Sequence, residues 1–342
     1  MFNPQIIQKI AHTHKKKFQK LYEIEKILNA RLVGMEDAIR ALILSVASGE
    51  ALVFIGPPGT AKSRLIRDFC SIIGLIDPNN RMSQTNDDYF EYLLTPFTEP
   101  GELFGFYDIS ELNRSYKLKR LDKGVLQKAK VIYLDEVFNA SSAILNSLLS
   151  ILNEGIFHDR GERVQLDWKC LFAATNQPPE TTELEAVFDR FILRCYIDNV
   201  PAHPGDLGNL IHAGWNETYG HHSGAKEFSS ILRELDQFRN NLGEMTDNKE
   251  LVPDQNAPVF ANLAQFVSQL RDRGLSQMSN RRLVKLSYIM LINRVYRAII
   301  NNEEGELKID KEELMLIPRF FLDRQDEESV RKLERLVRNM SF

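Results

Sequence analysis

The sequence has few cysteines, no long apolar run and no basic, apolar leader. Three cysteines occur among 342 residues, Cys70, Cys170 and Cys195, and none forms a CxxC pair. We interpret them as buried thiols of a protein kept in a reducing compartment. No stretch of about 18 apolar residues is present, and the N-terminus lacks a basic segment followed by an apolar one. We therefore expect a cytoplasmic protein with no membrane span.

The sequence also lacks a large excess of either basic or acidic residues. The 43 Lys and Arg side chains against 47 Asp and Glu give a formal net charge of −4 and a pI near 6.0. This balance argues against a protein that coats nucleic acid over its whole surface. Hydrophobic residues make up 43% and charged residues 26%, which is ordinary for folded proteins, and the length favours two domains.

Short apolar runs alternate with helical patterns over the first two thirds of the chain. Strands are expected at residues 51–55, 131–134, 171–175 and 191–197, and helices at 5–30, 37–47, 63–73 and 141–153. This alternation indicates a parallel sheet covered on both faces. Only helical patterns follow, at 225–242, 258–270, 281–301, 311–320 and 327–339. An α/β domain of residues 1–200 and a smaller helical domain of residues 201–342 are therefore predicted.

A glycine-rich segment separates the first expected strand from the next helix. Its sequence is Gly56-Pro57-Pro58-Gly59-Thr60-Ala61-Lys62-Ser63. In a phosphate-binding loop of this kind, backbone N–H groups surround the phosphates, the lysine reaches the β- and γ-phosphates and the serine binds Mg²⁺. The usual pattern places glycine before the lysine, where this chain has Ala61. We expect the methyl group to be tolerated if the backbone keeps a negative φ there.

Polar groups end two of the later strands. Asp135 and Glu136 follow the run 131–134, and Asn176 follows the run 171–175. We expect Asp135 to hold Mg²⁺ through water, and Glu136 to orient or deprotonate the water that attacks the γ-phosphate. Asn176 could hydrogen-bond the γ-phosphate or that water. Carboxyl ends of neighbouring parallel strands meet at one edge of a sheet, so the set predicts a site for ATP and Mg²⁺.

The motifs together resemble those of the AAA+ ATPases, and most closely the MoxR family and its RavA-like branch. The resemblance covers nearly the whole chain and rests on Val33-Gly34, Gly56–Ser63, Leu134-Asp135-Glu136, Ala174-Thr175-Asn176, Asp189-Arg190-Phe191 and Ser279-Asn280-Arg281. It implies a P-loop NTPase fold with a five-stranded parallel sheet and flanking helices, followed by a smaller all-helical lid. Alanine before the lysine is itself usual in MoxR relatives.

The resemblance also implies roles for single residues. Val33 and Gly34 would line the adenine pocket. Asp135 and Glu136 would form Walker B, and Asn176 would be sensor 1.

Two arginines would complete the site. Arg190 resembles the arginine finger that enters the neighbouring subunit's site, with Arg194 as a rival candidate. Arg281 resembles sensor 2 of the lid, with Arg282 as its rival. A finger that lies away from its own phosphate-binding loop is useful only when another subunit presents a site to it, so an oligomer is expected.

Two insertions also resemble those of the family. Residues 95–123 resemble the helix-2 insert, and residues 155–166 resemble the hairpin before sensor 1. In relatives these segments project into the pore or the axial face of the ring and touch the client. Residues 114–130 hold seven basic side chains and one acidic one. This stretch could contact nucleic acid or an acidic protein, or it could be a solvated face.

The resemblance finally implies an activity and partners. It points to an ATPase that binds ATP and Mg²⁺ in a homo-oligomeric ring, a hexamer in the family, and remodels a protein client. A partner with a von Willebrand factor A domain often accompanies such proteins. The alternative is a nucleic-acid motor of the same insert-bearing clade, which the near-neutral charge disfavours. A nucleotide-gated scaffold without hydrolysis is disfavoured because Lys62, Glu136 and Arg190 are all retained.

Overall fold

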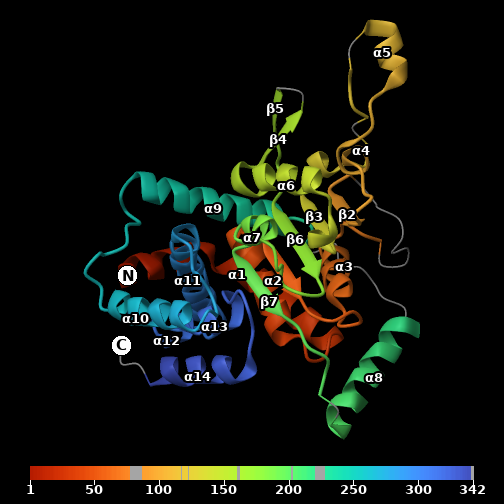
Figure 1. The fold of residues 1–342 in the computed structure, drawn as a ribbon. Coiled ribbons are helices and arrows are strands. Elements are labelled where there is room, and N and C mark those ends of the chain that lie inside the picture. Colours follow the sequence, from red (N-terminus) through yellow and green to blue (C-terminus); the bar gives the residue numbers. More distant parts are fainter. Residues whose placement is uncertain are drawn as a thin grey trace. The chain divides into compact units, whose positions relative to one another are not determined.

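The structure, a computed structural model, describes residues 1–77, 87–116, 118–121, 123–159, 162–201, 203–219 and 228–339. The chain forms two compact units (Figure 1). Unit 1 comprises Met1–Ser48, Ile192–Ala213 and Ser230–Phe342, and unit 2 comprises Gly49–Phe191 and Gly214–Ser229. Within the described part of the chain, no helix combines the length and apolar character needed to cross a membrane.

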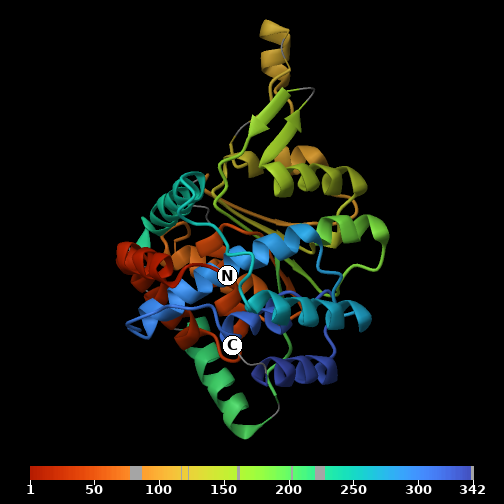
Figure 2. The ribbon, with the colours of Figure 1, turned by 90° about the vertical axis from the view of Figure 1, so that its left-hand side faces the viewer.

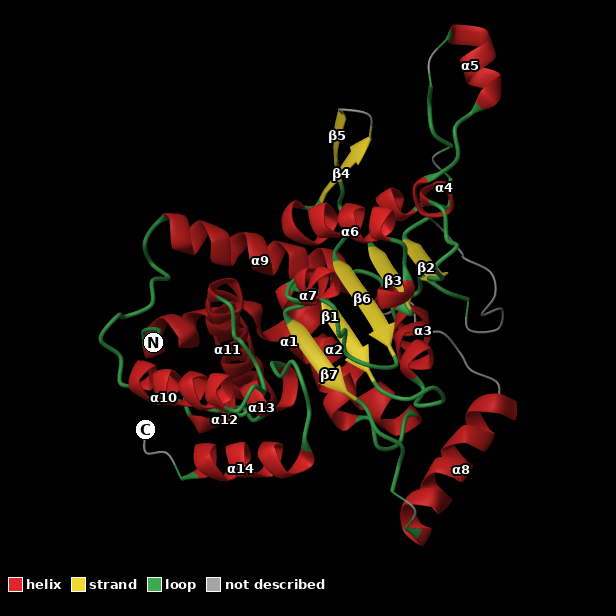
Figure 3. Ribbon diagram, viewed as in Figure 1, coloured by secondary structure: helices red, strands yellow, loops and turns green. Residues whose placement is uncertain are grey.

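The main sheet has five strands in the order β2-β3-β6-β1-β7. The strands are β1 (Leu52–Ile55), β2 (Tyr89–Leu93), β3 (Val131–Asp135), β6 (Cys170–Thr175) and β7 (Leu193–Tyr196). The pairs β2–β3, β3–β6 and β6–β1 are all parallel, and Figure 3 shows these four strands pointing the same way. β1 and β6 are buried along their whole length, as expected for strands covered on both faces.

Helices and a hairpin complete unit 2. They are α3 (Lys62–Ile72), α4 (Pro100–Phe104), α5 (Ile109–Ser115), α6 (Ser142–Glu154) and α7 (Thr182–Phe188), the 3₁₀ helices η1 (Leu126–Lys128) and η2 (Val137–Asn139), and the antiparallel strands β4 (Ile156–Asp159) and β5 (Glu162–Gln165). Figures 1 and 2 show the insert that carries α5 and the β4–β5 hairpin projecting from the same end of this unit.

Backbone pairing closes the insert at its base. Phe106 O accepts a hydrogen bond from Leu121 N at 2.8 Å, and Lys119 O accepts one from Asp108 N at 2.7 Å. Gly105 lies beside this pairing with a φ of +84°, and a Cβ there would come within 2.0 Å of Leu121 O. Only glycine permits this approach. The insert therefore leaves unit 2 as two paired arms with α5 at the tip.

Unit 1 is built mainly from helices. They are α1 (Pro4–Arg31), α2 (Glu36–Ser48), α9 (Ile231–Asp247), α10 (Val259–Asp272), α11 (Asn280–Ile300), α12 (Lys311–Leu314), α13 (Leu316–Phe320) and α14 (Glu327–Arg338); α8 (Pro204–Tyr219) runs across the division of the chain. α1 packs against α11, where the Phe18 and Tyr296 rings meet at 6.0 Å. Because of this packing, the first 48 residues group with the C-terminal helices, which differs from the expected division at residue 200.

The predicted fold class is confirmed: a five-stranded parallel sheet with flanking helices and a helical C-terminal region. The four expected strands correspond to β1, β3, β6 and β7. β2, α7, α8 and the helices α4 and α5 of the insert have no counterpart among the expected strands and helices. The helix expected at 225–242 begins outside the described residues and continues as α9, and the helix expected at 311–320 is divided at Met315 into α12 and α13.

Candidate nucleotide-binding site

The carboxyl ends of three strands of unit 2 meet at one edge of the sheet. Ile55 of β1 pairs with Thr175 of β6, and β3 ends at Asp135 beside Leu93 of β2. A pocket of about 400 Å³ opens at this edge, within the range of ligand sites. Its lining consists of Pro58, Gly59, Thr60, Ala61, Lys62, Ser63, Arg64, Arg67, Asp135, Glu136 and Asn176. The structure thus brings the expected loop, both Walker B carboxylates and Asn176 together.

Lys62 is the first residue of α3 and is almost fully buried. Its Nζ donates hydrogen bonds to Gly56 O at 2.7 Å and to Pro57 O at 2.9 Å. Burial lowers the pKa of this ammonium group, and the charges of Asp135 and Glu136 oppose that shift. The side chain therefore lies folded over its own loop at a helix N-terminus, where the backbone N–H groups favour an anion.

Ala61 departs from the expected backbone conformation. Its φ is +60° and its ψ is +22°, so the residue lies in the left-handed region, and the condition of a negative φ is not met. The loop must turn here to place Lys62 and Ser63 at the start of α3. A Cβ in this region crowds the following carbonyl, which costs about 1–2 kcal/mol. The loop thus keeps the shape that glycine would adopt freely and carries the strain of the methyl group.

The Ser63 hydroxyl is held by two groups of β3. Ser63 Oγ donates to Asp135 Oδ2 at 3.0 Å, and Tyr133 OH donates to Ser63 Oγ at 3.0 Å. Asp135 Oδ1 accepts from the backbone N–H of Glu136 at 3.0 Å. A hydroxyl and a carboxylate in direct contact are oxygen donors of the kind that Mg²⁺ prefers. The side chains present therefore fit the expected roles of Ser63 and Asp135 as metal ligands.

Glu136 and Asn176 form the second polar pair of the pocket. Asn176 Nδ2 donates to Glu136 Oε1 at 2.6 Å, and Asn139 Nδ2 donates to Glu136 Oε2 at 3.4 Å. Glu136 has a φ of +52°, which turns the chain from β3 directly into η2. Burial and the neighbouring charge of Asp135 raise the pKa of Glu136, while Lys62 and Asn176 lower it. A carboxylate with a raised pKa, oriented by an amide, is suited to accept a proton.

The two finger candidates lie in different surroundings. Arg190 follows α7, is partly exposed, and donates from Nε to Asn153 Oδ1 at 3.0 Å; it does not line the pocket described above. Arg194 of β7 is 2% exposed and forms an ion pair with Asp323. A buried arginine with an internal partner cannot reach another subunit, so of the two only Arg190 remains a candidate.

The two candidates for sensor 2, Arg281 and Arg282, also differ in burial. Arg282 is 1% exposed, and its Nη1 donates to Asp323 Oδ1 at 2.6 Å while its Nη2 donates to Phe321 O at 2.6 Å. Arg281 is exposed at the N-terminus of α11. Asp323 is therefore shared by two buried arginines of unit 1, Arg194 and Arg282, whereas Arg281 is exposed.

Gly34 lies at a small cavity in unit 1. A pocket of about 240 Å³ is lined by Gly34, Met35, Glu36, Asp37, Ala38, Tyr196, Ile197 and Asp198. Gly34 has a φ of +71°, and a Cβ there would come within 2.9 Å of Val200 Cγ2. The position thus requires glycine for both its conformation and its space. Val33 precedes it in the turn between α1 and α2 and does not line this cavity.

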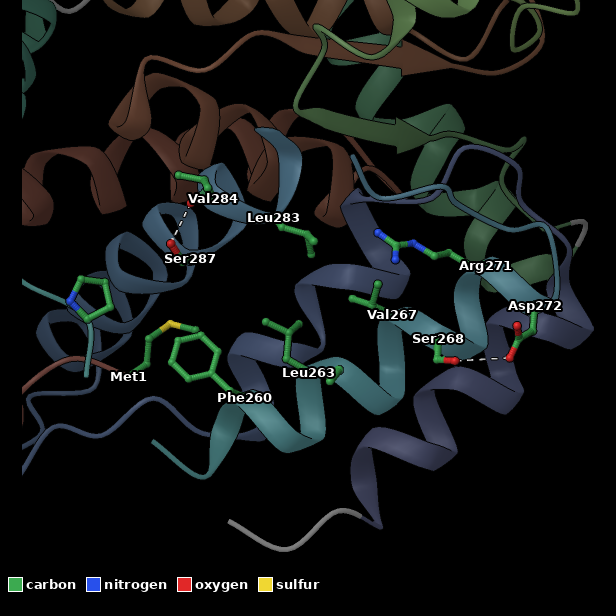
Figure 4. A pocket seen from close by; sticks show the side chains of 12 residues that line it. Met1, Phe260, Leu263, Val267, Ser268, Arg271, Asp272, Leu283, Val284 and Ser287 are labelled. Carbon is green, nitrogen blue, oxygen red and sulfur yellow. Dashed lines mark hydrogen bonds between the residues drawn. The ribbon is translucent and has the colours of Figure 1, made fainter. Parts of the chain in front are cut away.

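A larger cavity of about 580 Å³ in unit 1 lies between α10 and α11 (Figure 4). Its walls are mainly apolar and include Phe260, Leu263, Val267 and Leu283. Arg271 lies at its edge, but its guanidinium group donates to Gln277 O and Met278 O. Across the described residues, no group of three or more His, Cys, Asp and Glu side chains that could hold a metal is found.

Among the described basic side chains of residues 114–130, Arg114, Lys119, Lys123 and Lys128 are exposed, whereas Arg120 is not. Arg120 is largely buried: its Nε pairs with Asp159 Oδ2 at 3.1 Å, and its Nη1 donates to Gly105 O at 2.7 Å. It therefore connects the insert to the β4–β5 hairpin. Two other members of the stretch, Lys117 and Asp122, lie outside the described residues.

Three residues at the site have no counterpart in the sequence analysis: Arg64 and Arg67, which line the pocket, and Tyr133, which contacts Ser63. Tyr133 reads as one more apolar position of a buried strand, and Arg67 as a surface residue of a helix. Arg67 in fact lines the pocket and forms a bidentate pair with Glu91 of β2. The i, i+4 spacing of Ser63 and Arg67 on one helix face was the available signal.

Comparison with known proteins relates this chain to a protein family. A sequence model of the MoxR domain in the MoxR-vWA-beta-propeller ternary systems matches residues 19–239. An uncharacterized protein of Methanocaldococcus jannaschii is 40% identical over 193 residues, 56% of this chain and 48% of that protein. A structural protein of Acidianus two-tailed virus is 31% identical over 198 residues, 57% of this chain and 30% of that protein. The chain thus spans half or less of the length of these relatives.

A solved structure supports the fold. The crystal structure of a protein of Cytophaga hutchinsonii, provisionally assigned as an ATPase, has a TM-score of 0.61 and 15% identity, covering 98% of each chain. At this identity the likeness shows the fold alone. Because the family model matches more than half of the 342 residues, the chain belongs to the MoxR family of AAA+ ATPases.

Proposed function

We propose that the chain hydrolyses ATP in an Mg²⁺-dependent reaction at the pocket of unit 2. The observation that carries this proposal is the pairing of Glu136 with Asn176 beside Lys62 and the Ser63–Asp135 pair in one pocket. Lysine and helix N-terminus would hold the β- and γ-phosphates, and Ser63 and Asp135 would hold Mg²⁺. When bound, Mg²⁺ neutralises charge on the phosphate oxygens.

Glu136 is the proposed general base. Its carboxylate would take a proton from a water molecule as the water oxygen attacks the γ-phosphorus, and the bond from that phosphorus to the bridging oxygen of ADP would break. The amide of Asn176, which already donates to Oε1 of Glu136, would orient the carboxylate and the γ-phosphate. The products are ADP and inorganic phosphate.

The active form is proposed to be a homo-oligomeric ring, with six subunits as in the resembling family. Arg190 supports this, because it lies outside the pocket of its own chain, whereas its rival Arg194 is buried. In the ring, Arg190 would stabilise the transferring phosphoryl group in the neighbouring subunit, and Arg281 would act from the lid. Light scattering with ATP and Mg²⁺ tests this: monomers alone at micromolar concentrations would contradict the ring.

The proposed client is a protein. The insert exposes large apolar side chains, among them Phe97, Ile109, Tyr116 and Leu121, each more than half exposed. Apolar and aromatic surface of this kind favours a protein contact over nucleic acid, whose contacts are mainly basic. Arg120, moreover, is paired with Asp159 of the same unit. The family description supports a partner with a von Willebrand factor A domain and a β-propeller protein as companions.

Substitution of Glu136 by glutamine tests the activity. Glu136→Gln should keep ATP binding and lower phosphate release by about 10²–10⁴-fold, the contribution of a general base. Glu154→Gln is the matched control, since Glu154 is exposed at the end of α6 in the same unit and is expected to keep the wild-type rate. Unchanged phosphate release from Glu136→Gln would remove this residue from the reaction. Affinity capture with the same variant held in ATP would identify client and partner.

A further inference from the structure

The Ser63 hydroxyl is held by a residue that has no role in the reaction proposed above. Tyr133 and Asp135 are two positions apart on β3, so their side chains lie on the same face of the sheet. α3 packs against this sheet and presents Ser63 to both of them. Tyr133 is fully buried, and its hydroxyl group donates to Ser63 Oγ at 3.0 Å, while Ser63 donates to Asp135 Oδ2 at 3.0 Å.

The hydrogen-bonding capacity of a serine hydroxyl is limited. It has one donor and two acceptor lone pairs. In this site the donor is used toward Asp135, and one lone pair accepts from Tyr133. Both bonds together fix the torsion of the hydroxyl group and leave one lone pair for a further ligand. Without the tyrosine hydroxyl, the Ser63 oxygen would be fixed by one bond instead of two.

We propose that Tyr133 is a positioning residue for Mg²⁺, because its hydroxyl orients the free lone pair of Ser63 Oγ toward the cation that accompanies the nucleotide. The inference rests on the proposed ATPase function and adds to it a residue that acts on metal affinity. Hydrogen-bonding partners of metal ligands commonly change metal affinity by about 10–100-fold when they are removed.

A further contact supports this role. The position of α3 over the sheet is held by Arg67, one turn after Ser63, because Arg67 forms a bidentate pair with Glu91 of β2 at 2.6–3.1 Å. Glu91 lies opposite Tyr133 in the β2–β3 register. The helix α3, which carries Ser63, is thus attached to β2 through Arg67 and to β3 through Ser63.

Tyr133→Phe is the discriminating variant, because it removes one buried hydroxyl and keeps the ring. Tyr89→Phe is its matched control: Tyr89 is also buried, lies on β2, and donates to Glu91 Oε2 at 2.8 Å, but does not contact Ser63. The measurement is binding of Mn²⁺, as a stand-in for Mg²⁺, to the full chain with ADP, followed by electron paramagnetic resonance. ADP affinity without metal and thermal melting are measured on the same samples.

We expect Tyr133→Phe to weaken Mn²⁺ binding at least about tenfold while ADP affinity without metal stays within about twofold. Tyr89→Phe should leave Mn²⁺ affinity within about twofold, although both variants lose a buried hydrogen bond and melt earlier. Equal Mn²⁺ affinity in the two variants would overturn the proposal. A wild-type chain that takes up no Mn²⁺ with ADP would overturn the proposed ATPase function as well, so the two failures are distinguishable.

A double-mutant cycle makes the assignment specific to Ser63. In a Ser63→Ala background the oxygen that Tyr133 orients is absent, so adding Tyr133→Phe should change Mn²⁺ affinity by less than about twofold. A loss as large as in the wild-type background would show that Tyr133 acts by another route, and would overturn the proposal.

Discussion

Because the backbone at Ala61 is strained, we predict that Ala61→Gly raises the free energy of unfolding, whereas glycine substitutions usually lower it. Ala61 has a φ of +60°, a conformation that costs a residue with a Cβ about 1–2 kcal/mol. Ala61→Gly removes this strain, but it also adds about 0.5–1 kcal/mol of chain entropy to the unfolded state. Subtracting these ranges leaves a net stabilisation of about 0–1.5 kcal/mol, with a midpoint of roughly 0.8 kcal/mol. At that midpoint, the melting temperature of the transition in which unit 2 unfolds rises by roughly 2–3 °C.

Ala264→Gly is the matched control. Ala264 is exposed in the interior of α10, where helical backbone suits alanine, so the same substitution should destabilise its unit by about 0.5–1 kcal/mol. Scanning calorimetry of both variants without nucleotide measures the two shifts. If Ala61→Gly lowered the melting temperature as Ala264→Gly does, the left-handed conformation of the loop would be refuted.

Two further predictions concern the arginines. Arg190→Ala should lower turnover by about 10³–10⁵-fold in the assembled ring and leave ATP binding and the melting temperature unchanged. Arg194→Ala should instead destabilise unit 1 by about 3–5 kcal/mol, because it breaks a buried ion pair. Phosphate release and melting curves distinguish the two effects, and an Arg194→Ala protein of wild-type stability would contradict the second prediction. Burial alone would raise the pKa of Asp323, but Arg194 and Arg282 outweigh it and lower that pKa. The stabilisation is therefore complete above the unfolded pKa of about 3.9 and is lost as pH falls through the folded value. Asp323→Asn should accordingly melt earlier at neutral pH and lose less stability on acidification than the wild type; parallel pH profiles for the two proteins would contradict this.

The sequence predicted the buried strands well because their composition is extreme. β1 and β6 are apolar at nearly every position, which only a strand covered on both faces requires. β2 was missed because Tyr-Phe-Glu-Tyr-Leu interrupts its apolar pattern with Glu91. That glutamate is needed to bind Arg67 of α3, and a partner 24 residues away is not visible in a local pattern.

The candidate site was predictable where a motif determines both residue type and position. The loop, Asp135, Glu136 and Asn176 were named from spacing, and the structure brings them to one pocket. Arg190 and Arg194 could not be separated in this way, since two arginines four positions apart differ only in burial. Burial of Arg194 depends on Asp323, more than a hundred residues later. Tyr133 was missed for a similar reason: its role depends on a distance to Ser63, 70 residues earlier.

The shared carboxylate of Asp323 limits where the chain can be divided. A fragment of residues 1–200 would contain every motif of the nucleotide pocket, yet it would leave the Arg194 guanidinium group without its counter-charge. A C-terminal fragment would keep Arg282 and Asp323 but lose the other arginine. Neither fragment therefore keeps all the buried ion pairs of the whole protein. The same pairing predicts that Asp323 and the two arginines vary together within the family, because loss of the carboxylate alone leaves two buried cations without a counter-charge.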